Sequence, residues 1–422
     1  MARRKKPQKK GPARGRSSAA RPASGPSRKP GRLRKWASST ALDPTLFGLW
    51  LLIALPPLIF IPGLTDNFRL PKLLLTELLG LFSLLLLAFR LWRGPRLDLP
   101  GILGVLKAPG IRLVLPIVAA GSLGLFFGEH AEVTRRALPS LWIGGACLIG
   151  WALALKRREQ RLLLTGLLAP AALLATFAVL QFHNLFDPFS FQGRVTDRIG
   201  LTSLAGGAFD LSGYLVLPLL IAQAALPTAS KRWRLVLGVF LGLGLWASVA
   251  SRTVTALLAL VVGSALLWRR AAPRRRLLGV GALGLAAALV LVTVGPLKDR
   301  ARKIGTSLQK GEINRLLTGR LDAWRGAAWM LEQHPIVGVG HGAYRAEFGP
   351  ARLELSAEGV TFFRGQKQVF FTNAHSDFLD ALAEWGLLGA AVLMICAFFF
   401  VRHLRRRWRL EADAEVARGP PT

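Results

Sequence analysis

Runs of about 17–20 apolar residues recur along the chain, separated by short clusters of Lys and Arg. Runs of this length are typical of membrane spans rather than of helices in a soluble core. Each run is predicted to be a helix, because a span in lipid must pair its own backbone polar groups. We therefore predict an all-α, polytopic integral membrane protein with about ten transmembrane helices. The predicted spans are Leu46–Ile61, Leu73–Leu91, Leu113–Phe127, Leu138–Leu155, Leu162–Phe182, Leu211–Leu226, Leu235–Val249, Val254–Trp268, Leu277–Val294 and Phe378–Val401.

Composition excludes three other classes of protein. Of the 422 residues, 52% are hydrophobic and 19% are charged, a balance that excludes a soluble two-domain enzyme and a disordered binder. The chain has only 2 cysteines, so it is not a disulfide scaffold. Both Cys147 and Cys396 fall inside apolar runs, where we expect them to be small buried residues.

The basic residues behind the net charge of +33 are unevenly distributed along the chain. With residue 1 placed in the cytoplasm, the inner segments carry 36 of the 56 Lys and Arg, whereas the four short outer connections carry 7. Membrane proteins carry such an excess of positive charge on their cytoplasmic side. An odd number of spans would place a basic cluster outside, so an even number is favoured.

Residues 1–40 are predicted to be a disordered cytoplasmic tail, because they are rich in Ser, Pro, Gly and basic residues. Residues 1–35 hold 14 Lys and Arg and no acidic residue. We interpret this charge as a topology anchor attracted to anionic lipids of the inner leaflet. Nucleic-acid binding is disfavoured, since no aromatic residue is interleaved before Trp36. Further spans follow the first apolar run, so no cleavable signal peptide is expected.

The remaining chain divides into four predicted parts. Residues 41–294 form a bundle of about nine spans, residues 376–401 the last span, and residues 402–422 a cytoplasmic tail. Residues 295–375 form an outer segment with 12 Lys and Arg and 7 Asp and Glu. A structureless segment of that length is uncommon, and Arg320–Gln333 has the pattern of an amphipathic helix. This helix is predicted to lie against the membrane surface through one apolar face, made of Leu321, Trp324, Ala328 and Leu331.

Three features on the predicted outer side carry groups that could do chemistry. The first is Ser251-Arg252-Thr253, at the tip of a very short hairpin between two spans. An Arg at the membrane boundary is functional when it faces the helix bundle. It extends to lipid phosphates when it faces outward. From this residue alone, both interpretations stay open.

The second feature is Gly319–Trp324, followed by His334–Gly340. Arg320 lies where the amphipathic helix begins, and it is either a ligand-binding residue or a solvated charge on a surface helix. Gly338 and Gly340 lack the strand-turn-helix context of a nucleotide-binding motif. They predict a tight turn with close approach of the backbone.

The third feature is Asn373–Asp377, which leads directly into the last span. His375 could act as a base near neutral pH, with a nearby carboxylate fixing its tautomer. Acids in a membrane helix are costly unless they are paired or wetted, so we expect this end to face a water-filled cleft. The acids that enter the span at helical spacing are Asp377, Asp380 and Glu384. The alternative is an ordinary capped helix start with a solvated His.

The predicted topology places Arg252, Arg320 and His375 on the same side of the membrane, near its outer face. Arg presents a rigid fork of donors to phosphate oxygens. A positioned His can take a proton from an attacking hydroxyl. The set therefore suits a di-anionic phosphate group on a lipid. No cluster of Asp, Glu and His has convincing metal-ligand spacing, so we expect neither a metal nor a cofactor.

With these motifs the chain resembles the O-antigen ligase and polymerase family of bacterial membrane glycosyltransferases. The similarity covers roughly residues 190–400. It rests on Ser251–Thr253, Gly319–Leu321 with Trp324, His334–Gly342, and Asn373–Ser376 with Gly386–Gly389. A further stretch, Gly193–Gly200, is similar to the loop that precedes a span in the family.

The resemblance implies a helical fold of the C-type glycosyltransferase kind in the bacterial inner membrane, with residues 295–375 as a periplasmic catalytic loop. The family transfers a glycan from an undecaprenyl diphosphate carrier to a hydroxyl of lipid A-core, of a growing glycan or of a protein. Carried over by position, Arg252 and Arg320 would bind the diphosphate. His375 would activate the acceptor or stabilise the leaving diphosphate, in a metal-independent, inverting reaction. Further substrate contacts would come from Arg198, Asn373, Gly338 and Gly340.

Two alternatives stay open. A Wzy-type polysaccharide polymerase would share this chemistry and differ only in its acceptor. A flippase for a lipid-linked glycan would line its path with charges at mid-membrane depth, whereas this chain keeps its polar residues near the outer rim. The expected partners are therefore a lipid-linked glycan donor, a hydroxyl acceptor and membrane lipids, and no nucleic acid.

Overall fold

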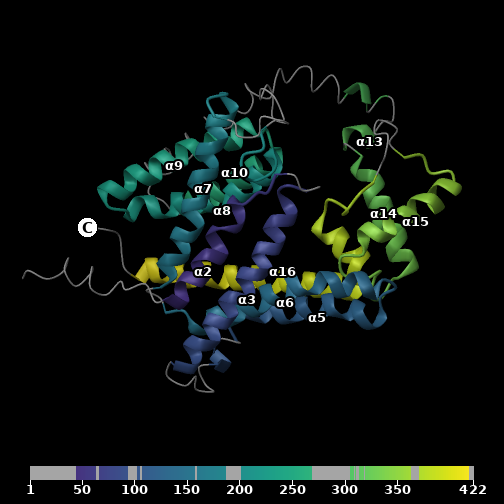
Figure 1. Cartoon of the computed structure of the whole chain (residues 1–422), viewed down its shortest axis with the longest axis horizontal. Helices are drawn as coiled ribbons and strands as arrows, with labels where there is room; N and C mark the ends of the chain where they lie inside the picture. Colours follow the sequence, from purple (N-terminus) through teal and green to yellow (C-terminus); the bar gives the residue numbers. More distant parts are fainter. Residues whose placement is uncertain are drawn as a thin grey trace, which may run out of the picture. The chain divides into compact units, whose positions relative to one another are not determined.

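The computed structural model describes residues 44–62, 66–93, 102–104, 107–156, 159–186, 201–268, 305–307, 309, 313–317, 319–362 and 370–417. Within these residues, every regular element is a helix (Figure 1). The helices are α2 (Pro44–Ala54), η1 (Pro56–Leu58), α3 (Arg69–Arg93), α5 (Pro109–Phe127), α6 (Ala131–Ala154), α7 (Gln160–Phe182), α8 (Ala208–Ala225), η3 (Leu226–Thr228), α9 (Lys231–Ala250), α10 (Val254–Trp268), α13 (Ile313–Leu316), α14 (Arg320–Gln333), α15 (Tyr344–Ala357) and α16 (Asp377–Ala417).

Seven of the described helices are long and apolar enough to cross a membrane. They are α3, α5 from Gly110 onward, α6, α7, α8 with η3, α9, and α16 as far as Leu410. Two shorter apolar helices, Thr45–Leu58 and α10, coincide with two more predicted spans. The all-α, polytopic membrane fold is therefore confirmed. The remaining predicted span, Leu277–Val294, lies outside the described residues, as do residues 1–40.

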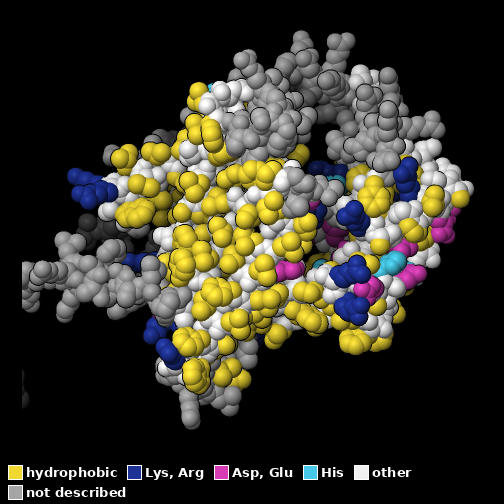
Figure 2. Space-filling model, viewed as in Figure 1, with side chains coloured by type: hydrophobic (Ala, Val, Ile, Leu, Met, Phe, Trp, Pro, Cys, Tyr) yellow, Lys and Arg dark blue, Asp and Glu magenta, His cyan; other side chains and the backbone are white. Residues whose placement is uncertain are grey.

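The apolar helices expose much of their side-chain surface. Only 17% of the span in α3 is buried, and Leu78 and Leu85 on that helix are 65% and 69% exposed. Figure 2 shows hydrophobic side chains over most of the visible face of the helices, whereas most of the charged side chains gather at the right of the view and further Lys and Arg lie at its left edge. Exposed apolar surface on this scale fits helices that are surrounded by lipid.

The helices pack around three hydrophobic cores. Helices α7 to α10 share one core, in which small residues allow close approach: a Cβ on Gly244 would lie 2.6 Å from Leu219 Cδ2. A second core joins α14, α15 and the start of α16 through Met330, Tyr344 and Phe348. Helices α2, α3 and α6 form the third, and α16 also packs along α5, which packs on α6.

Helix α14 begins at Arg320 and ends at Gln333, as predicted. The four residues of the predicted membrane-facing side are not buried in the protein core: Ala328 is exposed and the other three are partly buried. Contact of this face with the membrane surface stays a prediction. The buried residues are instead Asp322, Ala323, Gly326, Ala327, Trp329 and Met330. Ala and Gly let α15 approach closely, since a Cβ on Gly326 would lie 2.8 Å from Phe348 Cδ2. The pattern of large apolar residues misses this seam of small ones.

Candidate active site

Helix α16 is interrupted at Gly386, inside the last predicted span. The backbone there has φ 62° and ψ −161°, a conformation that residues with a side chain rarely adopt. A Cβ at this position would also collide with the carbonyl group of Ile336. Glycine is therefore required here by both the dihedral angles and the space.

The backbone groups freed by this break are paired with residues 335–342, which we call the glycine loop. In an unbroken helix they would pair with one another, residue i+4 to residue i. Four hydrogen bonds replace those pairs: Leu387 N–H to Pro335 O (2.8 Å), Leu388 N–H to Ile336 O (3.2 Å), Val339 N–H to Ala383 O (3.0 Å) and Gly340 N–H to Glu384 O (3.0 Å). Broken helices occur in membrane proteins only where protein or water satisfies the backbone in this way.

The glycine loop lies between α16 and α6. Its three glycines have left-handed backbones, with φ 68°, 112° and 77° at Gly338, Gly340 and Gly342. A Cβ on Gly338 would lie 2.5 Å from Ala383 O in α16, and one on Gly342 would lie 2.8 Å from Ala137 Cβ in α6. The predicted tight turn with close backbone approach is confirmed. Substrate contact by Gly338 and Gly340 stays a prediction.

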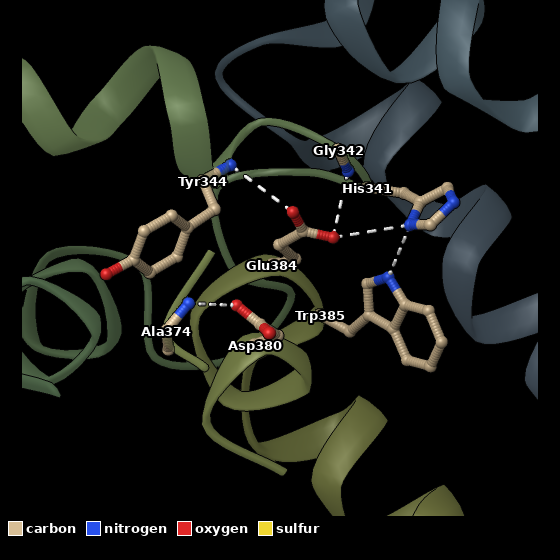
Figure 3. Close-up of polar contacts among 7 residues, drawn as sticks. All are labelled: His341, Gly342, Tyr344, Ala374, Asp380, Glu384 and Trp385. Carbon is tan, nitrogen blue, oxygen red and sulfur yellow. Dashed lines mark hydrogen bonds and ion pairs between the residues drawn. The ribbon is translucent and has the colours of Figure 1, made fainter. Parts of the chain in front are cut away.

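The carboxylate of Glu384 holds the end of this loop (Figure 3). It accepts hydrogen bonds from the backbone N–H of Gly342 (2.9 Å) and of Tyr344 (3.3 Å). It also lies 3.3 Å from Nδ1 of His341, which receives the indole N–H of Trp385 at 3.3 Å. Glu384 lies in α16 just before the break at Gly386. From there its carboxylate fixes the backbone at the start of α15.

Asp380 fixes the backbone of the segment before α16 in the same way. Its Oδ1 accepts the backbone N–H of Ala374 at 2.6 Å, as drawn in Figure 3. The sequence pattern assigned Asp380 and Glu384 to a water-filled cleft. The structure pairs both carboxylates with backbone amides, which is one way to satisfy a charged group in a membrane helix. Contact of this end with a water-filled cleft stays a prediction.

Two further His–Glu contacts tie the α5–α6 turn to this region. His130 Nε2 lies 2.5 Å from Glu347 Oε2 in α15, and His334 Nε2 lies 2.7 Å from Glu129 Oε2. The backbone N–H of His130 also donates to Val339 O in the glycine loop at 3.4 Å. The sequence interpretation overlooked these pairs, because their members are distant along the chain.

His375 projects from the Asp380-anchored segment. Its backbone is left-handed, with φ 54°, and its N–H donates to Oδ1 of Asn373 at 3.1 Å. The ring packs edge-on against Phe371, with centroids 5.6 Å apart, while the residue stays exposed. Partial burial lowers the pKa of the imidazole, and the positive charge of Arg320 lowers it further. Both effects favour the neutral form of the imidazole, the form that can accept a proton.

Arg320 is the first residue of α14. The turn before it is fixed by the left-handed Gly319, with φ 82°, and by the bond from Arg320 N–H to Leu317 O at 3.1 Å. One turn into the helix, the fully buried Asp322 accepts a hydrogen bond from Asn314 at 2.6 Å. The field of Arg320 reaches His375, so the structure brings these two predicted residues together across two elements.

Arg252 lies in a different part of the fold, in the turn between α9 and α10. It is left-handed, with φ 52°, and it is flanked by the buried Ser251 and Thr253. The hydroxyl of Ser251 donates to Ser248 O at 2.7 Å, and that of Thr253 donates to Ala208 O at 3.5 Å. The turn is thus held rigidly. Convergence of Arg252 with Arg320 and His375 stays a prediction.

Backbone strain marks two of the three predicted catalytic positions. The non-glycine residues with positive φ among the described ones are Asn184, Ser203, Arg252 and His375. Such conformations cost about 1–3 kcal/mol each and concentrate at functional sites. The strain is an independent reason to single out Arg252 and His375.

A buried polar network before α8 was not anticipated from the sequence. Gln181 donates to Thr202 Oγ1 at 3.0 Å and accepts from Ser203 N–H at 2.8 Å. Lys72 of α3 donates to the carbonyls of Leu204 and Ala205 at 2.6 and 2.7 Å. A lone Gln and a lone Lys inside apolar runs were the available signals. The network fixes the loop that leads to Ala208 and so to the Arg252 turn.

Arg198, a predicted substrate contact, lies outside the described residues. Asn373 is described and holds the backbone of His375, while its contact with substrate stays a prediction. Within the part of the chain that is described, no group of three or more His, Cys, Asp or Glu is arranged to hold a metal ion.

Comparison with known proteins agrees with the resemblance seen in the motifs. The family described as O-antigen ligase matches residues 237–394, a region that contains Arg252, Arg320 and His375. The exopolysaccharide production protein ExoQ of Rhizobium meliloti (strain 1021) is 27% identical over 294 residues. This similarity covers 62% of the chain and 59% of ExoQ, so the chain spans less than two thirds of that relative.

Proposed function

From the match of residues 237–394 to the O-antigen ligase family, we propose that this membrane protein is a glycosyltransferase of polysaccharide assembly. It transfers a glycan from undecaprenyl diphosphate to a hydroxyl acceptor, such as lipid A-core, at the periplasmic face of the inner membrane. The observation that carries the proposal is the fixed, left-handed backbone that presents His375, with the positive charge of Arg320 acting on its imidazole.

In the proposed reaction, the acceptor oxygen attacks the anomeric carbon of the donor sugar. The bond from that carbon to the phosphate oxygen breaks, and its electron pair leaves with the diphosphate. The neutral imidazole of His375 accepts the acceptor proton. Arg320 and Arg252 stabilise the charge on the leaving diphosphate through their planar forks of donors. Attack opposite the leaving group inverts the anomeric centre, and the scheme needs no metal.

The environment of His375 supports its role as the base. Lowering of its pKa by burial and by Arg320 keeps the ring neutral before reaction. Once the diphosphate is bound, its negative charge offsets Arg320 and makes the ring a better proton acceptor. Binding of the donor and activation of the acceptor are thereby coupled.

The test uses the purified full-length protein in lipid nanodiscs with an undecaprenyl-diphosphate-linked glycan and an acceptor. His375→Ala, Arg320→Ala and Arg252→Ala should each lower transfer by at least about 100-fold. Arg320→Lys should also be impaired, since Lys lacks the planar fork. Exposed Arg136→Ala, on α6, is the matched control. Wild-type rates in all three Ala variants would rule the proposal out.

A polymerase of the Wzy type is the second candidate, and the similarity to an exopolysaccharide production protein favours it. Polymerase and ligase differ in the acceptor, which is another lipid-linked glycan or lipid A-core. Surface polysaccharide from a deletion strain separates them. Core lipid without its polymer indicates a ligase, whereas core capped by a single repeat indicates a polymerase. Loss of carrier flipping with normal transfer would indicate a flippase.

A further inference from the structure

A cleft of about 800 Å³ lies among α2, α3, α6 and α7. Its walls are almost entirely apolar and include Leu49 of α2, Leu148 of α6 and Leu164 of α7. The few polar groups of the lining are largely satisfied by the protein itself. Trp151 Nε1 donates to Ser83 at 2.7 Å, and Thr76 Oγ1 donates to Lys72 O at 2.6 Å.

We propose that this cleft holds the polyisoprenoid chain of the lipid-linked donor. The proposal rests on the proposed function and adds to it a place for the hydrocarbon part of the substrate. A binding pocket of this volume is within the usual range for an apolar ligand. Its position among helices long and apolar enough to cross a membrane favours the hydrocarbon part of a lipid.

On one side, the outer end of the cleft is connected to the Arg252 turn. Leu73 of α3 lines the cleft, and its neighbour Lys72 bonds the loop at Leu204 and Ala205. That loop leads into Ala208, whose carbonyl accepts the hydroxyl of Thr253, the residue after Arg252. A chain seated in the cleft would therefore place its head group near this turn.

On its other side, the same end of the cleft lies next to the glycine loop. Ser140 of α6 lines the cleft, and Ala137, one turn earlier in α6, contacts the position of Gly342. The glycine loop is bonded to the start of α16, as is the segment that carries His375. Contacts therefore lead from this end of the cleft to the Arg252 turn on one side and to the elements that hold His375 on the other. This is the geometry expected for a phosphate head with its tail below.

The length of the cleft favours a long hydrocarbon chain. Lining residues along α6 run from Ser140 to Ala152, about 18 Å at 1.5 Å per residue. On α3 the lining extends from Glu77 out to Leu73, about 6 Å more. One leaflet of the hydrocarbon core is only about 15 Å thick. A chain that fills the cleft must reach past the middle of the membrane.

The lining contains one acidic residue, Glu77, which lies within a predicted span. No role was predicted for this residue from the sequence. Glu77 lies about 12 Å along the helix from Arg69, the first residue of α3, and accepts a hydrogen bond from Ser140. Ionisable residues at such depth are rare and mark pathways or binding sites. Glu77 lies in the wall of the cleft and is hydrogen-bonded to Ser140 of α6. This position fits a site that a lipid enters laterally from the membrane.

The first experiment detects the occupant directly in the full-length protein. A photoreactive benzoylphenylalanine replaces Leu148, which lines the cleft and is 55% exposed. The matched control places it at Val239 on α9, also 55% exposed but away from the lining. Nanodiscs contain phosphatidylethanolamine, phosphatidylglycerol and a small share of undecaprenyl phosphate. The undecaprenyl adduct at position 148 should exceed that at 239 about tenfold by mass spectrometry. Adducts at both positions that follow lipid composition would overturn the proposal.

The second experiment fills the cleft. A Cβ on Gly144 of α6 meets no atom within 4 Å, so Gly144→Trp occupies the cleft without disturbing helix packing. Gly242→Trp on α9 starts from equally open space outside the cleft and serves as the control. Gly144→Trp should lower the adduct at position 148 about tenfold, whereas Gly242→Trp should leave it unchanged. An unchanged adduct in both variants would contradict the proposal.

Transfer assays separate failure of this proposal from failure of the proposed function. Gly144→Trp should slow transfer from an undecaprenyl-linked donor and spare transfer from a donor with two isoprene units. Equal loss with both donors would contradict chain binding in the cleft. If the wild type transfers no glycan, the proposed function fails, while the cross-linking result still decides what the cleft holds.

Discussion

Helices α7 to α10 and the group formed by α14, α15 and the start of α16 pack in different ways. The first group has an apolar core, and its helices meet through side chains and glycines. The second group also has an apolar core, but backbone hydrogen bonds between the glycine loop and the broken α16 join its parts. The first group presents one short turn, at Arg252, whereas the second presents His375 from an irregular segment.

The difference shows what irregular backbone demands in a membrane protein. A continuous helix satisfies its own amides, whereas a loop among helices needs outside acceptors. Asp380 and Glu384 supply acceptors for amides of Ala374, Gly342 and Tyr344. These acids therefore support the segment that carries His375, and the comparison predicts that the second region is the more sensitive to single substitutions.

The largest effect is expected from Gly386→Val. The new side chain would collide with the carbonyl of Ile336 and would have to adopt a left-handed backbone. Overpacking and strain together should cost about 3 kcal/mol or more. We expect loss of transfer and rapid proteolysis between α14 and α16. Limited proteolysis and thermal unfolding in detergent measure these changes.

The control for this prediction is Gly242→Val in the first region. A Cβ there meets no atom within 4 Å, and the backbone is helical. The unfolding temperature should therefore change little. Equal damage from the two substitutions would show that the broken helix has no special role.

The next effect is expected from Glu384→Ala. The substitution leaves the N–H groups of Gly342 and Tyr344 without their acceptor. Each unpaired buried donor costs about 1–3 kcal/mol. Glu132→Ala, which removes an exposed partner of Arg135 and Arg136, should cost less than about 1 kcal/mol. Thermal unfolding of both variants checks the difference, and similar losses would argue against a supporting role for Glu384.

The sequence was informative where one side chain or one repeating pattern decides the structure. Seven helices long enough to span a membrane, two shorter apolar helices and the bounds of α14 follow from apolar periodicity. Motifs and topology placed Arg320 and His375 on the same side of the membrane, and the positive charge of Arg320 lowers the pKa of His375. The break at Gly386 could not be predicted, because a helix that gives its hydrogen bonds to a distant loop looks in sequence like an ordinary span. For the same reason, the roles of Asp380 and Glu384 required the fold.

A smaller effect sharpens the assignment of His375 as a base. The positive charge of Arg320 lowers the pKa of this imidazole, so removing the charge should raise it. In Arg320→Gln, the His375 titration should therefore shift to higher pH, and the neutral fraction should be lost at a higher pH than in the wild type. Carbon-13 NMR of labelled histidine, assigned with His375→Ala, measures the shift. Arg325→Gln on the same helix is the control. If His375 titrated at the same pH in both variants, the charge of Arg320 would not be what lowers the pKa of His375.

The smallest effect concerns the first region and separates strain from chemistry at Arg252. Glycine adopts φ 52° without the steric cost that Ala would retain. Arg252→Gly should therefore be more stable than Arg252→Ala by about 1 kcal/mol, although glycine also increases the entropy of the unfolded chain. Both variants lose the guanidinium group, so both should lose transfer equally. Thermal unfolding and transfer rates measured together test this separation. If Gly restored transfer relative to Ala, the shape of the turn rather than the charge of Arg252 would be what the reaction requires.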